Sequence, residues 1–238
     1  MPDSNKNFNH FKVHSQYSIC EGAIKIDELA DYCKSQKIKS MGLADSYNLC
    51  GALEFSEKIS KVGTHPIIGT QINMHRFDII GKVSLYATSE EGYKNLTKLS
   101  SSSYLDSSEK INPSCSLESL IDNSKDLILL TGNYTNFFGK LFYKNKLKEF
   151  EQILTTLKNS FKDRLYIEIQ RHNEFQEKNF ENYLLNISKT FQLPLIASQE
   201  IFYLDKEMHE AHDALICIGE KNFVDDKNRF RYSNQHYF

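Results

Sequence analysis

The sequence predicts an α/β fold, a (β/α)7 barrel of the TIM type. Strand-like apolar runs alternate with segments that have the apolar period of a helix, a pattern typical of βα units and a mainly parallel sheet. Seven such runs in 238 residues favour a barrel over an open sheet. A hydrophobic fraction of 40%, with 12% aromatic residues, four Pro and ten Gly, provides a sizeable core and argues against a disordered chain.

The strands are predicted from short apolar runs bounded by polar or turn residues, which suits strands covered on both faces. They lie at residues 11–14, 40–44, 66–73, 83–87, 127–131, 165–170 and 195–198. Three amphipathic helices are predicted from apolar residues at i, i+3, i+4 and i+7. These residues are Ile26, Leu29, Ala30 and Cys33, then Phe150, Ile153, Leu154 and Leu157, then Phe180, Tyr183, Leu184 and Ile187. In such barrels chemistry collects after the C-terminal ends of the strands, so those positions form the candidate site.

The net charge and the cysteine content of the sequence limit the classes of function that the protein can have. The formal net charge is −2. A domain that binds nucleic acid by itself usually has a basic face, so we expect only weak DNA binding. The basic cluster Lys227, Arg229 and Arg231 is too short to change this expectation. Five cysteines without a Cys-x-x-Cys motif indicate a reduced, cytoplasmic compartment. Residues 1–9 are predicted to be a polar tail without a signal-peptide core, and no stretch approaches the ~20 apolar residues that span a bilayer.

Sequence blocks near the predicted strands carry a family resemblance. They read HFKVH at 10–14, GLADSYN at 42–48, GALEF at 51–55, HPIIGTQI at 65–72, GYKNL at 92–96 and LILLTGN at 127–133. In this order, from His10 to the last residue, they resemble the PHP domain of bacterial DNA polymerase III alpha subunits. The resemblance implies a distorted seven-stranded (β/α) barrel over residues 10–238. In competent members of the family, His, Asp, Glu and Cys residues at the strand ends hold a cluster of metal ions.

The positions that correspond to this metal site are largely changed. They are Lys12, His14, Glu21, Asp45, Ser46, Gln71, Lys82, Asn133, Glu200 and Phe202. A site for several divalent ions needs many anionic or imidazole ligands, and a lysine ammonium repels the ion. We therefore expect no catalytic residue, no metal site and no cofactor in this domain. The alternative, that the remaining His14, Glu21, Asp45 and Glu200 hold one adventitious ion, stays open.

Two of the lost ligand positions have become lysines, Lys12 and Lys82. We expect their ammonium groups to stand where cations stood and to neutralise Glu21, Asp45 and Glu200, because unpaired carboxylates in one buried site raise each other's pKa. On this hypothesis the Lys12 ammonium lies within ~4 Å of one of these carboxylates. The alternative is that both lysines extend into solvent, which is the usual state of lysine.

The remaining histidines have ordinary interpretations beside metal binding. His172 is predicted to be a loop residue just past a strand rather than a leftover ligand. His209 and His212 are three residues apart on one helical face and could bind zinc, but they do not meet the His-Glu-x-x-His spacing, so we favour ordinary helix residues. His10 matches the first histidine of the family pattern, and we expect it to make a structural hydrogen bond.

The resemblance implies a scaffold role within a replicative DNA polymerase, a nucleotidyltransferase whose palm carboxylates and Mg are absent from this domain. It also implies docking of the separate proofreading exonuclease subunit and of other holoenzyme subunits, with DNA held by the rest of the polymerase and no membrane contact. We expect the chain to continue beyond Phe238 into a much longer polymerase. The rival interpretation is a stand-alone metal-dependent PHP phosphoesterase or 3′-5′ exonuclease, which the broken ligand set disfavours.

Overall fold

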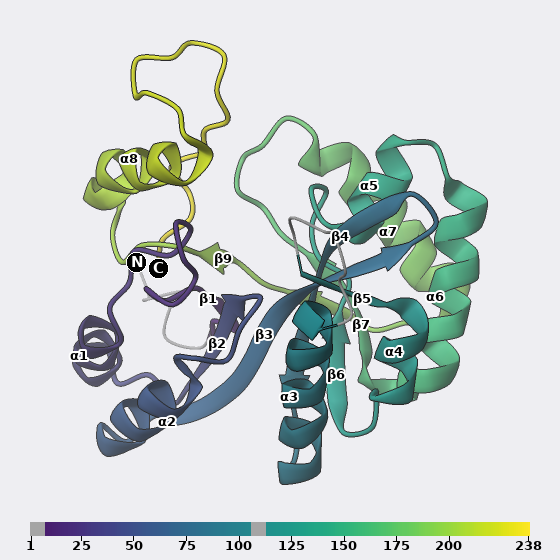
Figure 1. Cartoon of the computed structure of the whole chain (residues 1–238), viewed down its shortest axis with the longest axis horizontal. Coiled ribbons are helices and arrows are strands. Elements are labelled where there is room, and N and C mark those ends of the chain that lie inside the picture. Colours follow the sequence, from purple (N-terminus) through teal and green to yellow (C-terminus); the bar gives the residue numbers. More distant parts are fainter. Residues whose placement is uncertain (1–7, 106–112) are drawn as a thin grey trace. The chain divides into compact units, whose positions relative to one another are not determined.

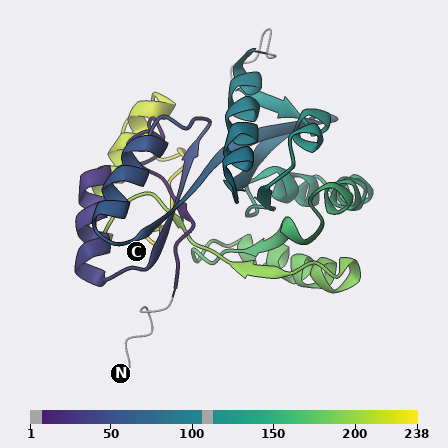
Figure 2. The ribbon, with the colours of Figure 1, turned by 90° about the horizontal axis from the view of Figure 1, so that it is seen from below.

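The computed structural model describes residues 8–105 and 113–238 and divides the chain into two compact units. The first unit combines the residues up to Ile68 with Gln199–Phe238, and the second unit is Gly69–Ser198. Each unit has strands and helices of its own (Figure 1, Figure 2). Most of the predicted tail, residues 1–7, lies outside the described residues, so its boundary stays a prediction.

Parallel strands form the sheet of the first unit. The strand β1 (Lys12–Val13) pairs with β2 (Ser40–Ser46) on one side and with β9 (Glu200–Ile201) on the other. Val13 lies opposite both Leu43 and Ile201, and Lys12 lies opposite Glu200. Because parallel strands run the same way, the residues that follow β1 and β2 emerge at one edge of this sheet.

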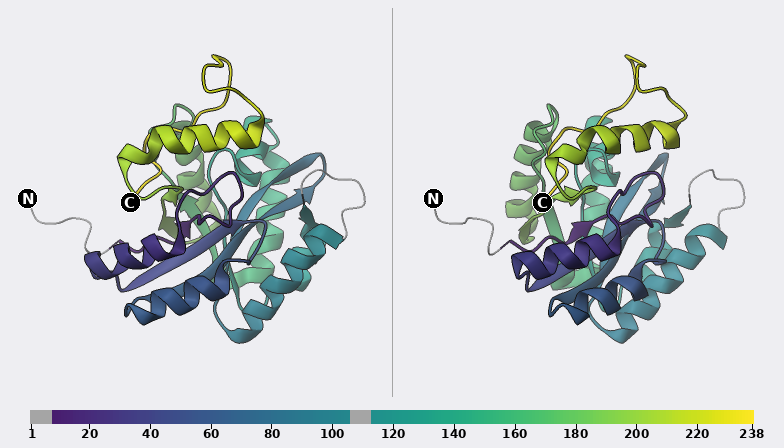
Figure 3. Two further views of the ribbon diagram at one scale, coloured as in Figure 1. Left: turned by 60° about the vertical axis from the view of Figure 1, so that its left-hand side comes forward. Right: turned by 90° about the vertical axis from the view of Figure 1, so that its left-hand side faces the viewer.

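The helices of the first unit cover an apolar core. They are α1 (Ile26–Gln36), α2 (Ala52–Lys61) and α8 (His209–Glu220), with a short 3-10 turn, η2 (Lys206–Met208), before α8. The helices α1 and α2 lie side by side (Figure 3). The predicted apolar face of α1 is buried, and its residues pack in one cluster with Val13, Leu43 and Phe55. This burial confirms the first predicted helix.

The second unit contains a mixed sheet. Its strands are β3 (His65–Arg76, which begins in the first unit), β4 (Ile79–Ala87), β5 (Ser114–Ser116), β6 (Leu127–Leu130), β7 (Leu165–Ile169) and β8 (Leu195–Ala197). Their order is β8-β7-β6-β4-β3, and β5 adds to β3. The pairs β3/β5, β6/β7 and β7/β8 are parallel, as expected for a mainly parallel sheet, and the exceptions are the antiparallel pairs β4/β6 and β3/β4. The cause is local: the turn Phe77–Asp78 joins β3 to β4 directly, whereas a parallel connection needs a dozen or more residues.

Helices of the second unit pack aromatic and aliphatic side chains against this sheet. They are α3 (Glu90–Leu105), α4 (Leu117–Asp122), α5 (Phe137–Tyr143), α6 (Leu147–Phe161) and α7 (Glu177–Phe191), with the 3-10 turn η1 (Lys162–Arg164). The predicted helices at 150–157 and 180–187 are confirmed as α6 and α7. Their apolar positions are buried, except that Tyr183 is half-buried.

All seven predicted strands are present, and two further strands within residues 8–105 and 113–238 were missed. These are β5, with three residues, and β9, with two, which are too short to show an apolar period. Among the described residues, no helix is long and apolar enough to cross a membrane.

Candidate functional site: a buried polar network

The ten positions of the predicted site divide between the two units. The first unit contains Lys12, His14, Glu21, Asp45, Ser46, Glu200 and Phe202, and the second contains Gln71, Lys82 and Asn133. In the first unit, His14 follows β1, Asp45 and Ser46 end β2, and Glu200 begins β9. The parallel arrangement of these three strands brings the side chains together, as the sequence predicted.

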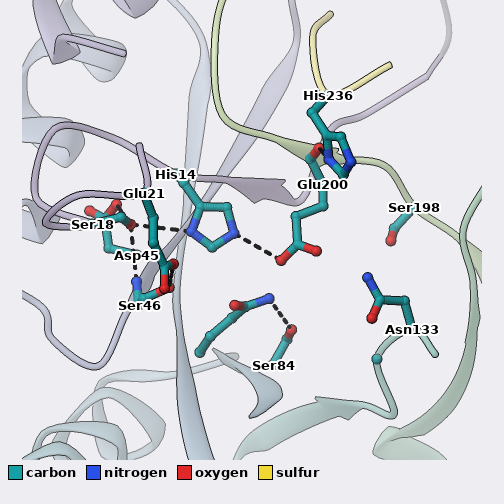
Figure 4. A network of polar contacts seen from close by, with 12 residues as sticks. His14, Ser18, Glu21, Asp45, Ser46, Ser84, Asn133, Ser198, Glu200 and His236 are labelled. Carbon is teal, nitrogen blue, oxygen red and sulfur yellow. Dashed lines mark hydrogen bonds and ion pairs between the residues drawn. The ribbon is translucent and has the colours of Figure 1, made fainter. Parts of the chain in front are cut away.

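His14 is fully buried at the centre of the first unit's network. Its Nε2 donates to Oε1 of Glu200 over 3.1 Å, and its Nδ1 lies 3.2 Å from Oγ of Ser18 (Figure 4). The Ser18 hydroxyl donates to Asp45 over 2.7 Å and accepts from the backbone N–H of Ser46 over 3.1 Å. Both imidazole nitrogens therefore contact protein groups, and neither is open to an ion.

Asp45 is held by hydroxyl and amide donors. It accepts hydrogen bonds from the Ser15 backbone N–H at 2.7 Å, the Ser15 hydroxyl at 2.8 Å and the Ser18 hydroxyl. Burial raises the pKa of Asp45, and the hydrogen bonds from Ser18 and Ser15 and the charge of His14 oppose that rise. Donors that belong to the fold thus take the place that a cation takes at a metal-binding aspartate.

Ser46 and Glu21 are two of the positions that correspond to the family's metal site. The Ser46 hydroxyl donates to Oε2 of Glu21 over 2.5 Å. The backbone carbonyl of the same glutamate accepts a hydrogen bond from Nε2 of His212 over 2.8 Å. Two of the changed positions are therefore bonded to each other, and the pair ties the loop after β1 to the end of β2.

Phe202 places an apolar ring at one of the positions that correspond to the family's metal site. It is 1% exposed and packs against three imidazoles, those of His14, His212 and His236, with ring centroids 4.6, 5.5 and 5.3 Å away. His236 also donates from Nδ1 to the carbonyl of Glu200 over 2.9 Å. The phenyl ring supplies no ligand and occupies the space beside the remaining histidine.

Lys12 is fully buried, so the alternative in which it extends into solvent is wrong. It lies opposite Glu200 in the parallel ladder, and neighbouring residues in such a ladder point to the same face of the sheet. Its expected contact with a carboxylate stays a prediction that this register supports. Lys82 is half-buried on β4, opposite Asn73.

In the second unit, amide side chains occupy the family's ligand positions. The Gln71 amide donates to the Ser84 hydroxyl at 3.4 Å, and the Asn133 amide donates to Oε1 of Gln170 at 3.1 Å. Asn133 also accepts from the backbone N–H and the hydroxyl of Thr135, at 2.9 and 2.7 Å. Each of these amides donates a hydrogen bond within the fold, and neither carries a charge for an ion.

Glu168 is a buried carboxylate that the sequence reasoning missed. It is 0% exposed and accepts from the Gly132 backbone N–H at 2.9 Å, the Gln170 amide at 2.8 Å and the Ser198 hydroxyl. The only feature of the sequence that could have indicated this residue is that it is a single acid within the apolar strand 165–169. Ser15 and Ser18 were missed as well, although both follow His14 closely in the sequence.

The other histidines behave as ordinary structural residues. His172 is buried just past β7, where its backbone N–H and ring bond to Glu177, so the loop interpretation is confirmed. Burial tends to raise the pKa of Glu177, but the hydrogen bonds from His172 and Glu174 lower it overall. His209 and His212 both donate from Nε2 to backbone carbonyls, which confirms their interpretation as helix residues.

His10 departs from its prediction. Its Nδ1 is buried without a hydrogen-bond partner in the described structure, and the ring packs edge-on against Phe8 and Phe238 with centroids 4.8 and 4.9 Å away. The expected structural hydrogen bond is therefore wrong for this atom. Burial lowers the pKa of His10 to about 4.

The hydrogen-bonded series Ser18, His14 and Glu200 resembles a catalytic triad of nucleophile, base and orienting acid, but Ser18 cannot act as a nucleophile here. Ser18 is 0% exposed and its proton goes to Asp45, so no substrate can reach an activated oxygen. In the described parts of the chain, no group of three or more His, Cys, Asp or Glu side chains is arranged to hold a metal ion. The residues present do not fit the metal cluster of the competent family members.

Comparison with known proteins places the chain in a family. The profile of the PHP domain matches residues 10–172. The chain is 36% identical to the DNA polymerase III subunit alpha of Caulobacter vibrioides over 97% of its own length and 21% of that protein. It is 32% identical to the subunit of the same name from Rickettsia bellii, over 97% and 20%. The chain thus spans about a fifth of the length of these curated relatives.

Solved structures support the fold. An amidohydrolase from Chromobacterium violaceum aligns with a TM-score of 0.52 at 9% identity, over 82% of this chain and 87% of that one. A protein from Bifidobacterium adolescentis, classed as a metal-dependent phosphoesterase, aligns with a TM-score of 0.51 at 12% identity, over 81% and 86%. These likenesses bear on fold alone and confirm the predicted α/β fold of the distorted barrel type. Since the family profile covers most of the sequence, the chain belongs to the PHP domain family.

Proposed function

We propose that the chain is the N-terminal PHP scaffold domain of a replicative DNA polymerase III alpha subunit. The observation that carries this proposal is its similarity, over 97% of its length, to proteins named DNA polymerase III subunit alpha. On this proposal the parent protein is a DNA-directed DNA polymerase, a nucleotidyltransferase of DNA replication. The Mg-dependent palm site then belongs to other parts of that protein, and this domain contributes no catalytic residue.

The buried network supports a structural role for the former metal site. His14, Asp45 and Glu200 are each bonded to groups of the fold, and Phe202 fills a ligand position with a phenyl ring. A network whose members are all bonded makes one arrangement rigid, which is what a scaffold requires. We therefore propose that internal hydrogen bonds replace the metal as the element that orders these strand ends.

The partners follow from the proposed parent protein. The domain docks the proofreading exonuclease subunit and other subunits of the polymerase III holoenzyme, while DNA is held chiefly by the rest of the polymerase. We propose a cytoplasmic location for the assembly. The five cysteines of the described structure are free thiols, which fits a reducing compartment.

A co-purification experiment tests this proposal. The chain is mixed with the exonuclease subunit encoded in the same genome, and complex formation is measured by size-exclusion chromatography. We expect a complex, and we expect no primer extension and no manganese-dependent phosphoester hydrolysis by the chain alone. A stand-alone PHP phosphoesterase of similar size serves as the control for both assays.

The rival interpretation, a stand-alone metal-dependent PHP phosphoesterase or 3′-5′ exonuclease, predicts the opposite pattern. It requires metal-dependent hydrolysis by the chain alone and no complex with the exonuclease subunit. The simplest measurement that distinguishes the polymerase interpretation from the phosphoesterase interpretation is the length of the native reading frame. A frame of several hundred further residues supports the polymerase, and a stop codon directly after Phe238 would support the phosphoesterase.

A further inference from the structure

The hairpin between β3 and β4 places an aromatic ring on the surface of the second unit. Arg76 and Ile79 form its closing pair, so only Phe77 and Asp78 make the turn. Phe77 is 54% exposed and has φ +55°, a left-handed conformation that is unusual for a bulky side chain. Asn or Gly is the common choice at such a position, so an aromatic residue held there suggests a function for its ring.

A guanidinium lies beside this ring, and two lysines contact the nearby residues Asp78 and Ile80. The guanidinium of Arg76 lies 5.3 Å from the centroid of Phe77. The helix α5 packs along β4 (Figure 1), and its Lys140 donates to the carbonyl of Ile80 over 2.8 Å. Lys144, just after α5, lies 3.8 Å from Asp78. The hairpin tip and the end of α5 therefore form one surface.

The local charge is positive although the chain as a whole is slightly acidic. Lys146 and Lys144 share the carboxylate of Asp78, and Arg76 pairs with Glu118. Lys140 donates to a carbonyl, which leaves its charge uncompensated by that bond. Burial lowers the pKa of Lys140, and the charges of Lys82 and Lys144 lower it further, as expected for an ammonium in a positive potential.

We propose that this surface binds single-stranded DNA. The cationic hairpin surface, as we name it, consists of Arg76, Phe77, Lys82, Lys140, Lys144 and Lys146. Its lysines contact phosphates, and a base stacks on the exposed Phe77 ring beside the Arg76 guanidinium. The combination of a basic track with an aromatic platform is typical of proteins that bind single strands without sequence preference. An acidic peptide would use the charges but not the ring, and a duplex keeps its bases stacked inside.

This inference goes beyond the scaffold role and does not depend on it. The balanced overall charge of the chain allows only weak, salt-sensitive DNA binding, and the proposal assigns that binding to this surface. All of its residues lie within the second unit, outside the buried network of the first.

Fluorescence anisotropy of the chain with a labelled oligothymidylate of about 16 nucleotides tests the proposal. Phe77→Asn removes the ring but suits the left-handed turn, so the fold is preserved. Lys140→Gln/Lys144→Gln removes two positive charges and keeps hydrogen-bond donors. Its matched control, Lys98→Gln/Lys125→Gln, removes two charges from exposed positions on α3 and before β6.

We expect Phe77→Asn to weaken single-strand binding at least about fivefold and to leave duplex binding unchanged. We expect Lys140→Gln/Lys144→Gln to weaken it about tenfold at ~50 mM salt and to reduce the salt slope by about 1.4, since each phosphate contact contributes about 0.7. The control pair should stay within twofold of the parent. Equal losses in both lysine pairs, an unchanged Phe77→Asn variant, or equally effective competition by polyglutamate would overturn the proposal.

Discussion

Replacing Ser18 by alanine should destabilise the protein strongly, although serine to alanine is a small change. The hydroxyl is fully buried and contacts three groups: it donates to Asp45, accepts from the Ser46 N–H and lies beside Nδ1 of His14. Asp45 keeps its two bonds from Ser15, so the main loss falls on the Ser46 amide and the His14 imidazole. Each buried polar group left unpaired costs about 1–3 kcal/mol, and we expect a total loss of about 3 kcal/mol.

Urea denaturation followed by circular dichroism measures this loss, and a thermal scan should show a decrease in Tm of about 6–12 °C. The matched control is Ser102→Ala, whose hydroxyl bonds the Lys98 carbonyl on the surface of α3 and whose removal should change the free energy of unfolding by less than about 0.5 kcal/mol. A double-mutant cycle with His14→Phe should give a coupling energy of at least ~0.5 kcal/mol. If Ser18→Ala loses no more than the control, the hydroxyl network does not hold this site together.

Three further substitutions probe other parts of the account. His10→Phe should make the fold less sensitive to acid. Burial lowers the pKa of His10 from 6.5 to about 4, so the folded protein must keep this imidazole neutral while the unfolded chain can protonate it. In the parent protein the free energy of unfolding is therefore highest above pH 6.5 and falls by about 2–3 kcal/mol by pH ~4.5. Urea titrations at both pH values measure this, and an equal acid loss in parent and variant would contradict it. Lys12→Met should lower the free energy of unfolding by about 3 kcal/mol, because Lys12 is fully buried beside Glu200 in the ladder and the variant loses the ion pair that we predict between its ammonium and a buried carboxylate. A variant as stable as the parent would reject the substitution of metal by lysine. Glu168→Leu should lower stability by about 3 kcal/mol or more in the same assay, because three donors lose their acceptor, and a neutral result would show that those donors find other partners.

The apolar pattern was enough to predict most elements of the fold. The spacing of Ile26, Leu29, Ala30 and Cys33 predicted α1, because only one face of a surface helix is buried and its period is visible in the sequence. The direction of β4 was not predictable in this way. An apolar run indicates a strand but not its partner, and the turn that makes β4 antiparallel contains Phe77 and Asp78 rather than an Asn-Gly pair.

The site was predicted at the level of position but not of chemistry. His14 and Asp45 were correctly placed together, because the parallel strands β1 and β2 align their C-terminal ends, and Glu200 joins them at the start of β9, the parallel partner of β1. The groups that satisfy them were harder to foresee. Serine is usually exposed, so nothing in the sequence indicated that Ser18 is fully buried and contacts Asp45, Ser46 and His14. Lysine is also usually exposed, and only the structure shows that Lys12 is buried.

Metal binding by the purified chain tests the central claim most directly. The chain is dialysed against zinc, manganese or iron, freed of unbound ions and measured by elemental analysis, with a competent PHP phosphoesterase as the positive control. Because the ligands that remain are bonded to serine, amide and imidazole groups and Phe202 fills one position, we predict no stoichiometric ion of any of the three metals. Two or more ions per chain, with manganese-dependent phosphoester hydrolysis that is lost in His14→Ala, would contradict the account.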